Sequence, residues 1–345
     1  MQSFQPAPPA RTHRTLQLAL FITSLAWFVA SNALAGHAAR GLCERFGSNA
    51  LRLPLTELFL LFLLAVGFSI LQGIAHSQGS LREVLGLPRR PTAGREWTIG
   101  AAVGWGMMAL SVLPMALGGT LYVSLWMSPR AFWLLAVNLF ALAIGSLVEE
   151  MAFRGYPYRR LIEAVGSVKA TIGMSLIFGV GHYLLNPDST RASLLITVLA
   201  GLLLSIAWLR THGLWLGWGL HFAWNASMGV LFGLPVSGLT DFSSVVQTRA
   251  VGRVWLTGGD YGPEGAFFTI LALLAGMVVL VRLTRDYAWN YTHAPIVAAG
   301  YPMDAPPPAA HTAMEQQARP AAPPPLVQIL PSTPQNRSVG DPPEY

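Results

Sequence analysis

The stretch Ala131–Arg154 has the sequence AFWLLAVNLFALAIGSLVEEMAFR, and it decides the fold. Residues 131–148 carry no charged side chain, and an apolar run of this length is typical of a helix that crosses a bilayer. The run ends in two adjacent carboxylates, Glu149 and Glu150. A charge in hydrocarbon costs at least about 2.5–3.5 kcal/mol. The stretch therefore predicts a membrane helix whose glutamates have compensating partners and a chemical role.

The composition of the whole chain supports a polytopic membrane protein. The 345 residues are 53% hydrophobic and 11% charged, whereas about a quarter of the residues are charged in a typical soluble domain. The net charge of +6 does not indicate a nucleic-acid partner, because the basic residues lie in short loops between apolar runs, as in membrane proteins generally. Cys43 is the only cysteine, which excludes an intrachain disulfide and a cysteine metal site.

Eight apolar runs are long enough to cross the bilayer as helices. They are Leu16–Leu34, Leu55–Ile74, Trp97–Leu117, Ala131–Phe153, Val168–Leu185, Ser193–Leu209, Leu214–Leu234 and Gly265–Leu283. The piece Leu121–Met127 is too short to span, so we expect it at the membrane interface, as we expect Glu57 near the start of the second run. The fold class predicted is an all-α, polytopic helix bundle in contact with membrane lipid.

The same pattern predicts the organisation of the chain. The polar, proline-broken tail lacks the apolar residues that a packed core needs, so we expect it to be disordered. The loops on the side of both termini carry more arginine and lysine, which predicts a multi-pass protein of the cell membrane with cytoplasmic termini. The predicted segments are a disordered N-terminus (1–14), N-terminal membrane helices (15–129), a catalytic core (130–234), a loop with the last membrane helix (235–284) and the disordered tail (285–345).

The two glutamates are expected to differ in role. Neighbours on an α-helix point about 100° apart, so Glu149 and Glu150 cannot face one group in the same way. Arg154 follows Glu150 by four residues, the spacing of a helical ion pair. We therefore expect Glu150 to pair with Arg154 and Glu149 to face the interior of the bundle.

Three further polar side chains lie inside other apolar runs. His182 ends the motif Phe178-Gly179-Val180-Gly181-His182 in the fifth run, where small residues allow close helix contact. His221 and Asn225, one turn apart, lie in the seventh run. Because ionisable residues within a membrane mark functional sites, we expect these groups and the glutamates to converge.

Two chemistries fit this set, and both hydrolyse an acyl bond. In the first, Glu149 with His182 activates a water molecule, and His221 and Asn225 donate hydrogen bonds to the oxyanion. In the second, Glu149 or Glu150 with both histidines binds a metal ion such as zinc, whose water attacks the carbonyl carbon. The residues alone do not decide between them.

The motifs Glu-Glu-x-x-x-Arg, Phe-x-x-x-His and His-x-x-x-Asn, each in its own apolar run, resemble those of the CAAX protease and bacteriocin-processing (CPBP, or Abi) intramembrane endopeptidases. The resemblance rests on Glu149, Glu150, Arg154, Phe178, His182, His221 and Asn225. It implies that Glu149 is the catalytic base with His182 as its partner, that His221 and Asn225 form the oxyanion pair, and that Arg154 and Phe178 orient them. The implied substrate is a peptide or a prenylated protein, and a metal requirement through Glu149, His182 and His221 stays open.

Two alternatives and one geometric demand accompany this hypothesis. A non-catalytic immunity or secretion-assisting protein could use the same scaffold, and a proton-coupled transporter is a third possibility; the complete motif set favours an enzyme. Glu149 should lie only about 7 Å from Arg154 along its helix, whereas His182 should lie about 20 Å into the next span. We therefore expect the segment 155–166 to enter the protein as a short amphipathic helix.

Overall fold

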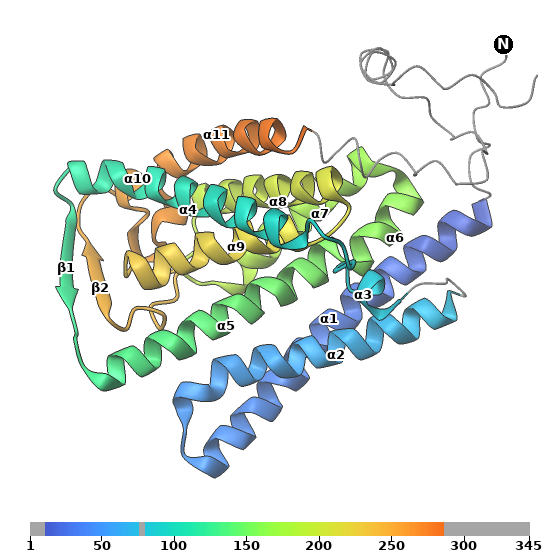
Figure 1. Ribbon diagram of the computed structural model, residues 1–345, viewed down its shortest axis with the longest axis horizontal. Helices are drawn as coiled ribbons and strands as arrows, with labels where there is room; N and C mark the ends of the chain where they lie inside the picture. Colours follow the sequence, from blue (N-terminus) through green and yellow to red (C-terminus); the bar gives the residue numbers. More distant parts are fainter. Residues whose placement is uncertain (1–10, 76–79, 286–345) are drawn as a thin grey trace, which may run out of the picture. The chain divides into compact units, whose positions relative to one another are not determined.

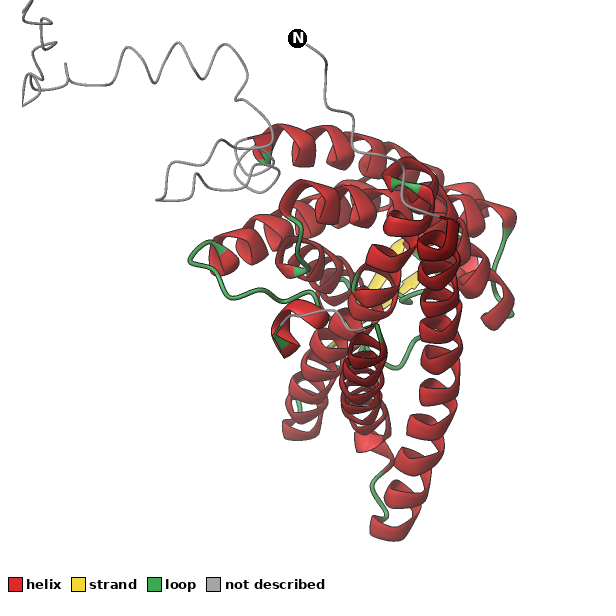
Figure 2. Cartoon of the chain, turned by 90° about the vertical axis from the view of Figure 1, so that its right-hand side faces the viewer, coloured by secondary structure: helices red, strands yellow, loops and turns green. Residues whose placement is uncertain are grey.

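The computed structural model describes residues 11–75 and 80–285, so the predicted tail beyond 285 and the first ten residues lie outside the described part. The described part is largely helical (Figure 2). Its α-helices are α1 (Arg11–Phe46), α2 (Arg52–Ile74), α3 (Leu81–Val84), α4 (Ala93–Leu117), α5 (Pro129–Arg154), α6 (Tyr156–Val165), α7 (Ser167–Leu185), α8 (Arg191–Thr211), α9 (Trp215–Ala226), α10 (Val254–Thr257) and α11 (Phe267–Leu283).

Helices occupy all eight predicted runs, which confirms a polytopic helical bundle. Among the described residues, six helical stretches are long and apolar enough to cross a membrane: those of α1, α2, α4, α5 with α6, α7 and α8. Helix α11 is shorter, and α9 continues through a π-helical turn, Ser227–Leu231. Helix α1 is longer than predicted, and the sequence between Leu34 and Phe46 contains no proline that would end it.

Most of the predicted interfacial segment Leu121–Met127 forms a β-strand. Strand β1 (Leu121–Leu125) pairs antiparallel with β2 (Val246–Ala250), with Leu121 opposite Ala250. The pair lies at the end of the bundle where α4 ends and α5 begins (Figure 1). The β-branched and aromatic residues of both segments favour a strand, but the pairing joins segments too distant in sequence for local patterns to indicate it.

Helix α9, which carries His221, packs against α4 with the two backbones in close contact. A Cβ atom on Gly100 would lie 2.1 Å from the carbonyl oxygen of Leu216, and one on Gly219 would lie 2.1 Å from that of Trp97. Small residues are what allow helix backbones to approach this closely. These contacts fix the depth and rotation of α9, and hence the direction of its polar side chains.

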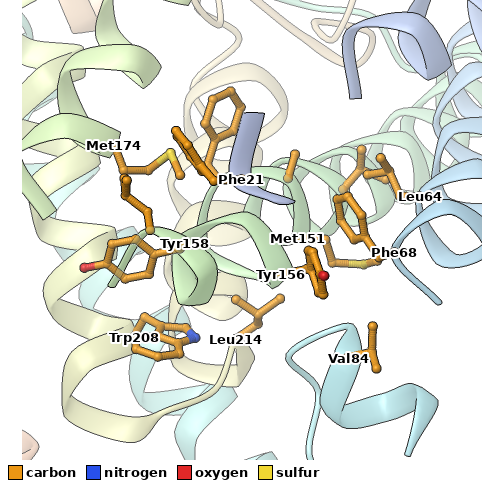
Figure 3. Close-up of a cluster of buried hydrophobic side chains, with 14 of the residues drawn as sticks. Phe21, Leu64, Phe68, Val84, Met151, Tyr156, Tyr158, Met174, Trp208 and Leu214 are labelled. Atoms are coloured by element: carbon orange, nitrogen blue, oxygen red, sulfur yellow. The ribbon is translucent and has the colours of Figure 1, made fainter. Parts of the chain in front are cut away.

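Two clusters of buried apolar residues form the core. The first joins α1, α2, α5, α6 and α7 and includes Phe68, Met151 and Tyr156 (Figure 3). The ring of Phe68 stacks on that of Tyr156 with centroids 5.5 Å apart, which ties α2 to the start of α6. The second cluster joins α4, α8, α9 and α11, with Leu204 and Leu220 among its members.

Helix α6 accounts for the predicted difference in depth between Glu149 and His182. Its 10 residues bury one face, which includes Tyr156, Tyr158 and Leu161, as expected for an amphipathic segment inside the protein. The helix lies beyond the end of α5 (Figure 1) and adds about 15 Å of chain before α7 begins at 1.5 Å per residue. His182 lies 15 residues after Ser167, about 22 Å back along α7. The extra length of chain in α6 therefore brings His182 level with the last turns of α5.

Candidate active site

Glu150 and Arg154 form the predicted ion pair, and both side chains are buried. The Nη1 atom of Arg154 donates a hydrogen bond to Oε1 of Glu150 over 3.2 Å, and Nη2 donates to the carbonyl oxygen of Gly201 on α8 over 3.2 Å. The guanidinium also lies over the ring of Phe178, 4.3 Å from its centroid. A buried pair of opposite charges needs such additional contacts to be tolerated, so Arg154 joins α5, α7 and α8 around Glu150.

His221 lies between the two glutamates. Its Nδ1 atom is 3.0 Å from Oε1 of Glu150, and its Nε2 atom is 3.8 Å from Oε2 of Glu149. Gly217, one turn earlier on α9, allows this approach, because a Cβ atom there would lie 3.0 Å from Oε2 of Glu150. Glu150 therefore orients the imidazole, and the second nitrogen of His221 points toward Glu149.

His182 completes the group from α7. Its Nδ1 atom is 2.9 Å from the carbonyl oxygen of Phe178 and donates to it, so in the neutral ring Nε2 carries the lone pair. That Nε2 atom is 3.8 Å from Oε2 of Glu149. The Phe178 ring, 4.4 Å from that of His182 and 6.4 Å from that of His221, holds both imidazoles from one side.

The Oε2 atom of Glu149 faces both histidines without a direct hydrogen bond. It is buried and has no hydrogen-bond partner among the described residues, whereas buried polar atoms normally have one. A distance of 3.8 Å is too long for a direct hydrogen bond.

These groups open onto a cavity of about 390 Å³. Glu149, His182, His221 and Asn225 all line it, which brings the predicted catalytic residues of three helices to one space. The side-chain amide of Asn225 has no hydrogen bond with another described residue, so it is available to a ligand. Most of the remaining wall is apolar and comes from both core clusters, for example Phe153, Phe178, Leu204 and Leu220.

A loop that precedes α11 covers part of this cavity. The carboxylate of Glu264 accepts hydrogen bonds from Nε1 of Trp224 (2.8 Å) and from the backbone N and Oγ of Ser237 (2.9 and 2.6 Å). The side-chain amide of Asn186 donates to the carbonyl oxygen of Ser237. Burial, with the nearby Glu264 carboxylate, raises the pKa of Tyr261 in this loop to about 12, so the phenol stays neutral. These contacts attach the loop to α7 and α9.

Glu57 lies in the wall of the cavity and not in the first turn of its helix, where the sequence pattern predicts it. Helix α2 begins at Arg52 and has no acidic residue in its first turn. The side chain of Glu57 lines the cavity and packs against Gly145 of α5, where a Cβ atom would lie 3.5 Å from Cδ of Glu57. This separation is an ordinary van der Waals contact, so α2 and α5 pack closely at this point.

The arrangement does not by itself provide a metal site. Among the residues that the structure describes, no group of three or more His, Cys, Asp or Glu side chains is placed so that it could hold a metal ion. The separation of 3.8 Å between Oε2 of Glu149 and each Nε2 atom is wider than the roughly 3.4 Å expected for two ligands of a tetrahedral zinc ion at about 2.1 Å each. In this conformation the spacing is therefore wider than an ideal tetrahedral zinc site requires.

Comparison with known proteins gives a family match in the central part of the chain. Residues 130–227 match the family model described as type II CAAX prenyl endopeptidase, Rce1-like. The match contains all seven residues of the motifs, from Glu149 to Asn225. No curated protein and no solved structure matches the chain. Helices α1, α2 and α4 and the loop with Glu264 lie outside the matched residues.

Proposed function

We propose that this chain is an intramembrane endopeptidase that hydrolyses a peptide bond with a glutamate-activated water, because residues 130–227 match the family model of Rce1-like type II CAAX prenyl endopeptidases, which is consistent with the CPBP family. The family match supports a membrane protease in general. The mechanism rests on the positions of Glu149, His182, His221 and Asn225.

The nucleophile in this mechanism is a water molecule that binds between Glu149 and the two histidines. It donates one hydrogen bond to Oε2 of Glu149 and the other to Nε2 of His182, which leaves an oxygen lone pair directed at the substrate carbonyl carbon. As the C–O bond forms, the proton moves to Glu149, the general base. The low-dielectric surroundings strengthen these polar contacts relative to bulk water.

The oxyanion is bound on the other side of the carbonyl group. The side-chain amide of Asn225 donates one hydrogen bond to it, and the Nε2–H group of His221 in its cationic form donates a second. Glu150 accepts the Nδ1–H of the same ring and balances its charge, with Arg154 balancing Glu150. In the second step, the C–N bond breaks and the proton on Glu149 passes to the leaving amine.

The cavity wall suggests the kind of substrate. A largely apolar cavity in a membrane helix bundle accepts a peptide with apolar side chains or a lipid-modified segment more readily than a charged soluble one. We propose a membrane-associated peptide or a protein with a prenylated C-terminus as the substrate. The multi-pass arrangement with both termini in the cytoplasm is part of the proposal and follows from the distribution of basic residues.

The observation that carries this proposal is the placement of Oε2 of Glu149 at 3.8 Å from Nε2 of both His182 and His221, at the wall of the cavity. The test is cleavage of a peptide library, with and without C-terminal prenyl groups, by the purified protein in lipid nanodiscs. Glu149→Gln and Glu149→Ala should each lower the rate by at least about 10³-fold, since both remove the general base.

Thermal unfolding of the same samples shows whether the variants are folded. Cleavage by both folded variants at the wild-type rate would contradict the mechanism. A wild-type protein that cleaves none of the peptides would favour the non-catalytic alternative on this scaffold.

A further inference from the structure

Three carboxylates line the cavity, and they differ in their partners. Glu264 accepts three hydrogen bonds from Trp224 and Ser237. Glu149 faces the two histidines. Glu57, also in the wall, has no hydrogen bond or ion pair with any described residue. Neither the family match nor the proposed hydrolysis uses Glu57, so its side chain needs another explanation.

The position of Glu57 relates it to the hydrolytic groups. Its carboxyl carbon packs on Gly145 of α5, four residues before Glu149, and positions four apart on an α-helix are neighbours about 6 Å apart on one face. An extended peptide advances about 3.4 Å per residue. A peptide bond held at Glu149 would therefore place a residue about two positions away beside Glu57.

A second polar side chain on the same wall points to ligand binding. Asn32 of α1 lines the cavity from the helix that packs against α2, and its side-chain amide also has no hydrogen bond with a described residue. The other residues that α1 and α2 contribute to the wall are Phe28, Leu53 and Leu60. The α1–α2 side therefore presents an acid and an amide, both without partners among the described residues, in an otherwise apolar wall.

An unpaired carboxylate in such surroundings is unfavourable unless it is protonated or a cation binds it. A cationic group gives a carboxylate its strongest hydrogen bonds. We propose that Glu57 is a specificity-determining residue that binds the ammonium or guanidinium group of a lysine or arginine side chain in the substrate, about two residues from the cleaved bond. The inference rests on the proposed peptide hydrolysis and adds the class of side chain that the site selects.

The test uses N-acetylated peptides, so that a terminal amine cannot supply the cation. Each position around the cleaved bond is varied as Lys, Gln or Glu, and kcat/KM is measured for wild type, Glu57→Gln and Glu57→Lys. In the wild type, Lys should exceed Gln by about tenfold at one position, as expected for a charge-assisted contact. The ratio should fall to about one in Glu57→Gln, and Glu57→Lys should favour Glu at that position. Glu44→Gln, which removes an exposed carboxylate from α1, is the matched control and should retain the wild-type ratio.

Binding separates this inference from the proposed reaction. The affinity of fluorescent Lys and Gln peptides is measured on Glu149→Gln protein, with and without Glu57→Gln, and the preference for Lys should depend on Glu57. If Glu57→Gln abolishes the preference for Lys in binding, the inference is supported even when the wild type cleaves no peptide. The absence of cleavage would then count only against the proposed hydrolysis. The inference would be overturned if the Lys-to-Gln ratio, in binding or in cleavage, were the same with and without Glu57→Gln. This includes a result in which Glu57→Gln slows the cleavage of all peptides by the same factor.

Discussion

Oε1 of Glu150 lies 3.0 Å from Nδ1 of His221, although the two residues are 71 positions apart in the sequence. The same oxygen accepts the hydrogen bond of Arg154. One buried carboxylate oxygen therefore serves both the ion pair within α5 and the imidazole of α9. This shared contact places His221 against Glu149, so the second glutamate of the pair acts by orienting the group that faces the first.

Arg154→Met should destabilise the protein strongly. The change leaves the buried charge of Glu150 without its cation and removes the contacts with Gly201 and Phe178. We expect the free energy of unfolding, measured by chemical denaturation in micelles, to fall by about 3–5 kcal/mol. Glu163→Gln is the control, because it breaks a partly exposed pair with Arg160 and should change stability by less than about 1 kcal/mol. Equal losses for the two variants would contradict the structural role of Arg154.

Asn225→Ala should slow the reaction without unfolding the protein. The amide of Asn225 lines the cavity and has no partner among the described residues, so its removal breaks no internal hydrogen bond there. Loss of one oxyanion donor lowers kcat by about 10²–10³-fold, while KM and the thermal unfolding temperature should change little. Steady-state kinetics on one peptide provide the measurement, and an effect confined to KM would assign Asn225 to substrate binding instead.

The two glycines before His182 offer a matched pair of substitutions. A Cβ atom on Gly179 would lie 2.3 Å from Cγ2 of Val198 and 3.1 Å from its backbone N, whereas one on Gly181 would meet nothing within 4 Å. Gly179→Ala should therefore push α7 away from α8, displace His182 and lower both the unfolding temperature and kcat. Gly181→Ala should retain the wild-type unfolding temperature. Similar unfolding temperatures for both variants would show that the close contact of α7 with α8 is not needed.

Removal of divalent metals tests the mechanism directly. Because the proposed reaction uses Glu149 and the histidines without a metal, cleavage should be unchanged after treatment with EDTA and with 1,10-phenanthroline. Metal content measured on the same sample by mass spectrometry gives an independent check. Activity that is lost with chelator and restored by zinc would replace the proposed mechanism with zinc catalysis through Glu149, His182 and His221.

The local patterns of the sequence are sufficient to predict the helices and the motif residues. Long uncharged runs report directly on bilayer thickness, so the eight segments are predictable. The four-residue spacing of Glu150 and Arg154 predicts their pairing, because it depends on helix geometry alone. The bond between Glu150 and His221 is not predictable in this way, since it depends on how α9 packs against α4 and α5.

Other features escape local patterns for related reasons. Glu57 has the sequence signature of an interfacial acid, and its place in the cavity becomes clear only when α2 is packed against Gly145. The pairing of β1 with β2 and the contacts of Glu264 with Trp224 and Ser237 join segments far apart in the chain. In the motif before His182, the sequence predicts close helix contact at both glycines, but only Gly179 has a neighbouring helix within 4 Å of its missing Cβ atom.

Helix α6 has a consequence for which changes of chain length the protein can accept. It contributes no residue to the cavity wall, yet its length sets where along α7 the chain comes level with Glu149. A deletion of two residues in α6 would shorten it by about 3 Å and rotate the start of α7 by about 200°, enough to turn His182 away from its partner. The number of residues between the first two motifs thus sets the position of His182 relative to Glu149. This segment should therefore tolerate substitutions on its exposed face far better than insertions or deletions.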